Sequence, residues 1–138
     1  MSHAVDRGRA VRDWMSRKPA AVQADSPIGA AVALMHGAEI RHLLVMEGDR
    51  LTGILSSRDL GRLAGDVSPG LLSAPVSRIM TEDPVTVAPE APVTTAARVL
   101  LEMKIGSLPV RDGDEIVGIL TVADALESLL WFAQGAAR

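Results

Sequence analysis

The chain has 138 residues, a formal net charge of −3 at pH 7 and no cysteine. This length predicts one compact unit, or two half-size units that share a core, and the lack of cysteine excludes disulfide scaffolds, thiolate metal clusters and thiol catalysis. The acidic balance argues against a nucleic-acid partner, and no apolar run reaches the roughly 18 residues of a membrane span. The N-terminal residues lack the apolar core of a signal peptide, so we expect a cytoplasmic protein.

The first part of the chain predicts a lead-in, a strand and a helix. A lead-in over residues 11–16 stops at Pro19, and a short apolar strand follows over residues 20–22. Ser26 before Pro27 predicts a capped helix with proline at its first position. Apolar residues at helical spacing follow at positions 28, 31, 32 and 35 and predict one buried stripe.

A hairpin and a second helix are expected next. The apolar segments 43–45 and 51–55 flank residues 47–49, where a glycine between acidic residues is typical of a tight turn. Ser56 then predicts the cap of a helix. Residues 65–75 contain two prolines and two glycines and indicate a linker.

The second half of the chain repeats the first at a constant offset, so that Met15 corresponds to Met80 and Asp59 to Asp124. Residues 15–59 align with 80–124 without a gap and share 14 identities in 45 positions, where unrelated composition would give about three. The identical residues of the first copy are Met15, Pro19, Val22, Pro27, Ala31, Ile40, Leu43, Val45, Gly48, Asp49, Gly53, Ile54, Leu55 and Asp59. The repeat predicts a strand over 85–87, a helix after Pro92, a second hairpin and a last helix from Thr121.

We therefore expect a mixed α/β fold built from two repeats of strand, helix, strand, strand and helix. The first repeat covers residues 1–64, the linker 65–75 and the second repeat 76–138. Each copy alone would bury too little to be stable, so the two should fold together about a pseudo-twofold axis. A cleft between such copies is a natural place for a ligand.

The last helix ends in a strongly apolar run. Large exposed apolar patches are unusual on monomers, so we expect this run to pack in the core, with a dimer contact as the alternative. Its residues are Leu126, Leu129, Leu130, Trp131 and Phe132.

The sharpest local pattern is Gly-Ile-Leu-Ser/Thr-x-x-Asp, which stands at residues 53–59 and again at 118–124. Glycine lets a ligand or another backbone approach closely, and a hydroxyl with free amides at a helix start suits an anion. The aspartate one turn later can accept both hydroxyls of a ribose. The structural alternative is a helix cap, in which the hydroxyl caps the helix and the aspartate complements its dipole.

These motifs resemble those of a tandem pair of cystathionine β-synthase (CBS) domains, often called a Bateman module. The similarity runs from about residue 11 to residue 130. It rests on four components, in the same order in each copy: Met-Ser/Thr-x-x-Pro, Ile-x-x-Leu-x-Val, Gly-Asp in the turn, and Gly-Ile-Leu-Ser/Thr-x-x-Asp. The resemblance implies a regulatory binding module, not an enzyme, that usually assembles as a homodimer.

The same resemblance implies a ligand and a partner. The ligand would be an adenosine nucleotide such as AMP, ADP or ATP, with NAD and S-adenosylmethionine as further candidates. The module would signal to a separate effector protein that the sequence does not identify. A second hypothesis stays open: a ligand-free dimerisation or protein-interaction scaffold, favoured by the lack of charge in one of the two clefts and by the apolar helix end. The chain also departs from the family pattern at Leu44, where proline is frequent, and at Ala123, which offers no polar group beside Asp124.

Ligand-binding residues also follow from the resemblance. The Ser/Thr and Asp of the last motif would hold the ribose and nearby phosphate, backbone at the first strand would receive the adenine, and basic residues of the other repeat would meet the phosphates. The better site then consists of Thr121, Asp124, Arg41, His42, Pro84, Val85 and Thr86. The poorer site consists of Ser56, Asp59, Pro19, Ala20 and Ala21, with Arg58 as a local substitute for the charge that Gly106 and Ser107 lack.

Catalysis is not expected from the residues themselves. No nucleophile stands near an evident base, and no group of histidines and carboxylates has the spacing of a metal site. Without such a constellation, the sequence favours binding over chemistry.

Overall fold

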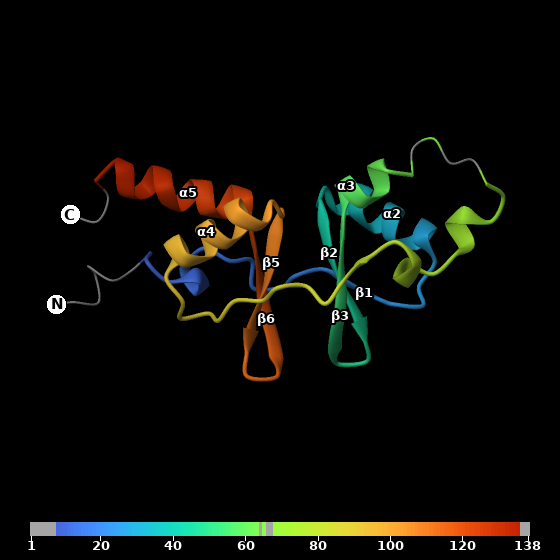
Figure 1. The fold of residues 1–138 in the computed structure, drawn as a ribbon, viewed down its shortest axis with the longest axis horizontal. Helices are drawn as coiled ribbons and strands as arrows, with labels where there is room; N and C mark the ends of the chain where they lie inside the picture. Colours follow the sequence, from blue (N-terminus) through green and yellow to red (C-terminus); the bar gives the residue numbers. More distant parts are fainter. Residues whose placement is uncertain (1–7, 64, 66–67, 136–138) are drawn as a thin grey trace. The chain divides into compact units, whose positions relative to one another are not determined.

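The computed structural model describes residues 8–63, 65 and 68–135. It contains two compact units, each with an antiparallel hairpin and helices packed on it (Figure 1). Among the described residues, unit 1 consists of 8–19 and 85–135, and unit 2 is Ala20–Pro84. The mixed α/β fold with two similar halves that the sequence predicts is confirmed.

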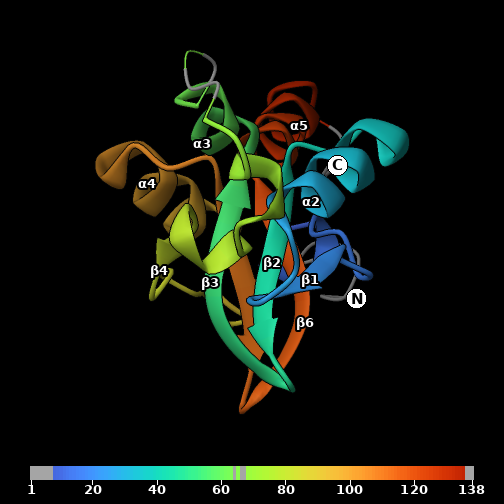
Figure 2. The same ribbon diagram turned by 90° about the vertical axis from the view of Figure 1, so that its right-hand side faces the viewer.

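Unit 2 is built on a four-stranded sheet in the order β1-β2-β3-β4. β1 runs parallel to β2, and the other neighbours are antiparallel; Figure 2 shows β1 and β4 on either side of the β2–β3 hairpin. Its elements are β1 (Ala21–Gln23), α2 (Ile28–Ala38), β2 (His42–Glu47), β3 (Arg50–Ser56), α3 (Ser57–Gly61), the 3-10 helices η2 (Leu71–Ser73) and η3 (Val76–Arg78), and β4 (Thr81–Glu82). The core joins α2 to the hairpin and to the lead-in of the second repeat, through Ala31, Met35, Leu43, Leu55 and Val76.

Unit 1 has the same plan with fewer strands. Its elements are the 3-10 helix η1 (Val11–Asp13), α4 (Val93–Met103), β5 (Ser107–Asp112), β6 (Glu115–Thr121) and α5 (Val122–Ala133). β5 and β6 pair as an antiparallel hairpin, and the core joins α4 to this hairpin and to Val11 of the N-terminal lead-in.

The compact units do not follow the sequence repeats, because each lead-in packs on the hairpin of the other repeat. Ser16 forms a pair of backbone hydrogen bonds with Ile119, with N–O distances of 2.9 and 3.0 Å, and Thr81 pairs with Ile54 at the equivalent positions. The predicted boundaries 1–64 and 76–138 describe the repeat in sequence and stay a prediction. In space, residues 8–19 belong with the second repeat.

The glycine of each hairpin motif makes this packing possible. A Cβ on Gly118 would lie 2.6 Å from the carbonyl oxygen of Ser16, and one on Gly53 would lie 2.9 Å from that of Thr81. Both contacts are shorter than real Cβ atoms show. Of the two sequence-based interpretations of this glycine, close approach of another backbone is the one that the structure supports.

The lead-ins also cap the long helices, which corrects the expected role of Ser26. α2 and α4 begin after Pro27 and Pro92, which are extended N-cap residues and make no side-chain cap. The first amide of α2 instead donates to the carbonyl of Ala74 at 2.9 Å, and that of α4 donates to Arg9 at 2.7 Å. At α2, the backbone carbonyl of Ala74, just before the second lead-in, thus satisfies the helix end that the Ser26 hydroxyl was expected to satisfy.

The strand predicted over residues 85–87 does not form. Only Val87 bridges to Val110, whereas the first repeat has a three-residue strand, β1. In the first repeat, the Leu44 amide donates to the carbonyl of Ala20 at 3.0 Å. Pro109 stands in the position of Leu44 and has no amide hydrogen, so that bond of the ladder is lost.

The expected burial of the C-terminal leucines is wrong. Leu126, Leu129 and Leu130 are 54, 61 and 59% exposed, and Ser128 is the buried residue of this part of α5. Only the aromatic end packs, with the rings of Trp131 and Phe132 against Trp14 in edge-to-face contacts. Val32, expected on the apolar stripe of α2, is also exposed, and so is Met103 at the end of α4, because the buried stripes of both helices are narrow.

Candidate functional site

The Ser/Thr-x-x-Asp motifs form a capping box at the start of α3 and of α5. In unit 1, the Asp124 amide donates to Thr121 Oγ1 at 3.2 Å and the Thr121 amide donates to Asp124 Oδ2 at 2.8 Å. Ser56 and Asp59 repeat both bonds at the same distances in unit 2. The predicted caps are confirmed, and they fix the hydroxyl and the carboxylate side by side.

The two capping boxes differ in how much hydrogen-bonding capacity they leave open. Asp59 is 7% exposed, accepts a further bond from the Ser56 hydroxyl at 3.0 Å, and has Oδ1 3.6 Å from Arg62. Asp124 is half-buried, and no ion pair holds its Oδ1 within the part of the chain that the structure describes. The carboxylate of unit 1 is therefore the more available acceptor.

A histidine and two arginines lie beside the capping box of unit 2. His42 is paired with Ser56 across the β2–β3 hairpin, and the backbone carbonyl of Arg41 accepts from the Ser57 amide at 2.8 Å. Burial lowers the pKa of His42, the negative charge of Asp59 opposes this, and the positive charges of Arg41 and Arg58 add to it. The imidazole is therefore mainly neutral at pH 7, and the positive charge here comes from the arginines.

Unit 1 has no cation at the equivalent positions. Ser107 is paired with Thr121 across the β5–β6 hairpin, and the Gly106 carbonyl accepts from the Val122 amide at 3.1 Å. Ser107 is only 6% exposed, and its hydroxyl has no hydrogen-bond partner among the described residues. Sequence reasoning treated Ser107 only as a missing charge; its alignment with His42 in the repeat was the available signal.

Backbone expected to receive a base lies at the same end of each hairpin. In unit 1, the parallel bridge between Val87 and Val110 puts Val85 and Thr86 beside the start of β5. Their amide and carbonyl groups make no hydrogen bond with any described residue, whereas in unit 2 the Ala20 carbonyl is used by β2.

The structure thus gathers the predicted site residues by unit. Unit 1 brings together Val85, Thr86, Thr121 and Asp124, and unit 2 brings together Ala20, Ala21, Arg41, His42, Ser56, Arg58 and Asp59. Pro19 and Pro84 are the residues at which the chain passes from one unit to the other. That Arg41 and His42 contact the phosphates of the ligand held by Thr121 and Asp124 stays a prediction.

Two further observations concern the described residues only. None of their helices is long and apolar enough to cross a membrane. No group of three or more histidines and carboxylates among them is arranged to hold a metal ion.

Relatives of this chain are found both as small proteins and as parts of enzymes. A CBS domain-containing protein of Dictyostelium discoideum is 32% identical over 133 residues, which cover 87% of this chain and 90% of that protein. Homoserine O-acetyltransferase of Methanocorpusculum labreanum is 35% identical over 114 residues, which cover 80% of this chain but only 22% of the enzyme. The match to the enzyme therefore concerns a small part of it.

Solved structures with adenosine ligands have the same fold. The crystal structure of CBSX2 in complex with AMP has a TM-score of 0.79 and 26% identity, covering 91% of this chain and 98% of that chain. The CBS domain pair of protein MJ0100, in complex with 5′-methylthioadenosine and S-adenosyl-L-methionine, has a TM-score of 0.77 and 26% identity, covering 91 and 97%. The family model of the CBS domain matches residues 11–65 and again residues 76–130. With two matches in tandem that span most of its length, the chain belongs to the CBS domain family as a CBS domain pair.

Proposed function

We propose that this CBS domain pair is a regulatory sensor that binds an adenosine nucleotide, AMP, ADP or ATP, and signals to a separate partner protein. The observation that carries the proposal is the capping box of α5, in which Asp124 Oδ1 and the Thr121 hydroxyl hydrogen have no partner among the described residues. The complexes of CBSX2 with AMP and of MJ0100 with S-adenosyl-L-methionine and 5′-methylthioadenosine support the same class of ligand.

The ribose fits the carboxylate of Asp124. Vicinal hydroxyls donate two hydrogen bonds in parallel, and a carboxylate with a free oxygen accepts them, as in dinucleotide-binding folds. The hydrogen bond from the Thr121 amide keeps the carboxylate oriented before the ligand arrives. Oriented acceptors lower the entropy cost of binding.

The adenine fits the backbone of Val85 and Thr86. Adenine presents a donor and acceptors along one edge, and an extended backbone with unused amide and carbonyl groups complements them. Val85, which is 36% exposed, supplies an apolar surface for the base. A phosphate would then meet the N-terminus of α5, a 12-residue helix whose dipole favours an anion.

Calorimetry tests the proposal with matched variants of the two capping boxes. AMP, ADP, ATP, NAD and S-adenosylmethionine are titrated into the wild-type protein, into Asp124→Asn and into Asp59→Asn. We expect micromolar affinity, about −8 kcal/mol, for one adenosine ligand, lost in Asp124→Asn and kept in Asp59→Asn. A panel of five ligands that gives no heat with folded, nucleotide-free protein would rule the sensor out.

Arg41→Ala and His42→Gln, each titrated with ATP and with adenosine, test the phosphate contacts. The family pattern assigns Arg41 and His42 to the nucleotide of Thr121 and Asp124, whereas in unit 2 they lie beside Ser56. Weaker binding of ATP in Arg41→Ala, with adenosine binding unchanged, supports the phosphate role, because a guanidinium–phosphate contact is charge-assisted. Equal losses for ATP and adenosine contradict it.

A second candidate function, a dimerisation or interaction scaffold, is favoured by the exposed leucines of α5. Leu126, Leu129 and Leu130 present adjacent apolar side chains that are more than half exposed. A homodimer through this face predicts that Leu129→Glu yields a monomer in light scattering, whereas the polar exchange Glu127→Gln leaves the dimer intact. A wild-type protein that is already monomeric contradicts the scaffold, and the sensor does not depend on it.

A further inference from the structure

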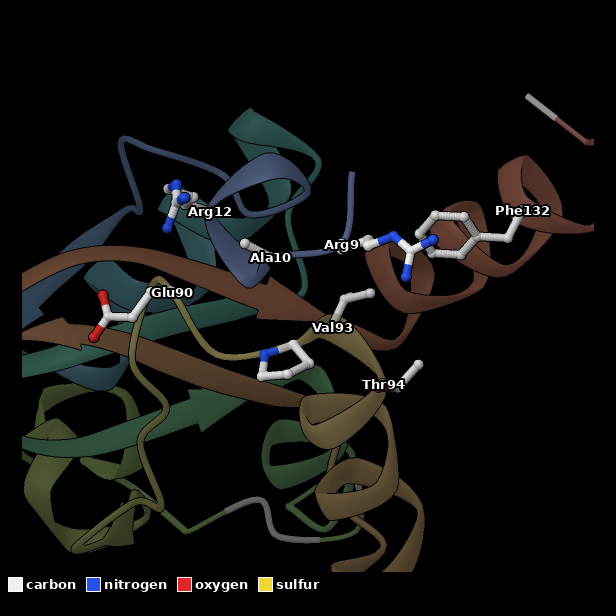
Figure 3. Close-up of a pocket in the computed structure, with 8 residues that line it drawn as sticks. Arg9, Ala10, Arg12, Glu90, Val93, Thr94 and Phe132 are labelled. Carbon is white, nitrogen blue, oxygen red and sulfur yellow. The ribbon is translucent and has the colours of Figure 1, made fainter. Parts of the chain in front are cut away.

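A cavity away from the capping boxes lies on unit 1, where the N-terminal lead-in crosses the start of α4. Its volume is about 650 Å³, within the range of small-molecule sites. Figure 3 shows Arg12 and Glu90 toward one end of the lining and Arg9 and Phe132 toward the other. No residue of the proposed nucleotide site lines it.

The frame of this cavity is held by main-chain hydrogen bonds. The amides of Val11 and Arg12 donate to the carbonyls of Ala91 and Pro89 at 2.8 and 2.9 Å. The Val93 amide donates to the backbone carbonyl of Arg9 at 2.7 Å. Substituting the side chain of Arg12 leaves these bonds in place. The frame therefore does not depend on the side chains that line the cavity.

Unit 2 provides an internal comparison, because it repeats the same frame. Its equivalent cavity, about 510 Å³, is lined by Ser77 and Asp25, which align with Arg12 and Glu90 in the sequence repeat. The acidic residue is thus present in both units, and the guanidinium only in unit 1. Since the frame forms with Ser77, Arg12 is not required for folding.

The charges at one end of the unit 1 cavity suit a zwitterion. Within the described part of the chain, no carboxylate lies within ion-pair distance of the Arg12 guanidinium, so Arg12 and Glu90 line the same cavity without neutralising each other directly. A guanidinium binds a carboxylate, in bidentate geometry where the approach allows it, and a carboxylate binds an ammonium group. An α-amino acid carries both groups on adjacent atoms.

The other end of the cavity suits an apolar side chain. The Phe132 ring is held by edge-to-face contacts with Trp14 and Trp131, with ring centroids 6.4 and 5.6 Å apart. Arg9 lines the same end of the cavity (Figure 3). Aromatic and apolar walls with a few polar groups at one end are typical of small-molecule sites.

We propose that this cavity binds a free α-amino acid with a large apolar or aromatic side chain. The Arg12 guanidinium takes the carboxylate, the Glu90 carboxylate takes the ammonium group, and the side chain lies toward Phe132. The site is separate from the nucleotide site and does not rest on the proposed adenosine function.

Intrinsic fluorescence gives a direct readout, because both tryptophans of the chain, Trp14 and Trp131, contact Phe132 in unit 1. The probe is L-phenylalanine. 3-Phenylpropionate, which lacks the ammonium group, and phenethylamine, which lacks the carboxylate, are titrated beside it. We expect L-phenylalanine to bind with a Kd below about 1 mM and each analogue to bind about tenfold more weakly.

Two variants separate the charged contacts. Arg12→Ser, which copies the residue of unit 2, should bind L-phenylalanine and phenethylamine equally. Glu90→Gln should bind L-phenylalanine and 3-phenylpropionate equally. Arg98→Ser, an exposed arginine of α4 that does not line the cavity, is the control and should behave as wild type.

Three results would overturn the proposal. The first is that L-phenylalanine causes no saturable change either in the fluorescence or in the amide resonances of Ala10 and Thr94. The second is that the wild-type protein binds 3-phenylpropionate as tightly as L-phenylalanine, and the third is that Arg98→Ser loses as much affinity for L-phenylalanine as Arg12→Ser does. Circular dichroism of Arg12→Ser checks folding. If that variant fails to fold, the affinities of Glu90→Gln for L-phenylalanine and for the two analogues decide alone.

Discussion

Ser107 lies directly opposite Thr121 on the β5–β6 hairpin, with its hydroxyl buried and without a hydrogen-bond partner among the described residues. The same position of unit 2 holds His42, opposite Ser56. A buried hydroxyl without a partner costs about 1–3 kcal/mol of stability. We infer that this hydroxyl, beside the capping box of α5, is a donor or acceptor for the proposed ligand.

Replacing this hydroxyl should stabilise the protein and lower its affinity for the nucleotide. We expect Ser107→Ala to raise the free energy of unfolding by about 1 kcal/mol, because the unsatisfied group is removed, and to lower nucleotide affinity. Urea denaturation and calorimetry measure the two effects. Ser128→Ala is the control: Ser128 is equally buried, but its hydroxyl donates to the Ala125 carbonyl at 2.6 Å, so no such gain is expected. A destabilised Ser107→Ala would contradict the assignment.

His42 should make stability depend on pH below about 6.5. Burial lowers its pKa in the folded state, so in the window between the folded and unfolded pKa values the unfolded chain binds more protons. The stabilisation is therefore fully present above the unfolded pKa and is lost as the pH falls through that window. Urea unfolding of wild-type protein at pH 7.5 and 5.5 should show the loss, and His42→Gln should reduce it. The exposed His36→Gln should resemble wild type; a pH dependence unchanged in His42→Gln would contradict the prediction.

The glycines of the hairpin motifs should tolerate no side chain. Gly118→Ala would bring a Cβ within 2.6 Å of the Ser16 carbonyl oxygen, and we expect a loss of about 2 kcal/mol or more in the free energy of unfolding. Gly37→Ala on α2, where a Cβ meets nothing within 4 Å, should instead be neutral or stabilise by about 0.5–1 kcal/mol. Chemical denaturation of both variants checks the contrast, and equal effects would show that the lead-in does not pack on Gly118.

Thr121 should contribute to stability through its hydroxyl oxygen, which caps α5, and to ligand binding through its hydroxyl hydrogen. Thr121→Ala removes the cap of α5 and should cost about 1 kcal/mol of stability together with nucleotide affinity. Thr121→Ser keeps the hydroxyl and should restore both. A Thr121→Ala variant that loses stability but binds the nucleotide as tightly as wild type would show that Thr121 only caps the helix. Asp124 alone would then bind the ribose.

Much of the fold could be predicted because the signals are local. The hairpins follow from an acidic turn around Gly48 or Gly113, both of which have φ 62°, and the capping boxes follow from Ser56 and Thr121 three residues before an aspartate. The repeat itself strengthens each signal, since it occurs twice. Residues close in sequence set these features, so sequence alone carries them.

The features that could not be predicted depend on residues far apart in the chain. The Ala74 carbonyl caps α2 from a distant segment of the chain, which no local pattern indicates, so a cap by Ser26 was expected instead. The absence of a strand over 85–87 follows from Pro109 on β5, a separate segment that the local pattern of 85–87 does not include. The exposure of Leu129 depends on what packs against α5, and an apolar sequence does not reveal it.

The candidate site likewise has a part that sequence predicts and a part that it does not. The motif residues Thr121 and Asp124 could be found from sequence, and the structure adds which of their atoms are unused. The orphan hydroxyl of Ser107 and the cavity between Arg12 and Glu90 depend on tertiary packing, so only the structure reveals them.

The exchange of lead-ins has a consequence for synthesis on the ribosome. Every residue of unit 2 lies between Ala20 and Pro84, so this unit can assemble as soon as that continuous stretch has emerged. Residues 8–19 are made before unit 2, yet Ile119, to which Ser16 bonds, is made after it. The N-terminal segment of unit 1 therefore stays without its hairpin until all of unit 2 has been synthesised, and a gene cut between the two repeats would encode neither unit in full.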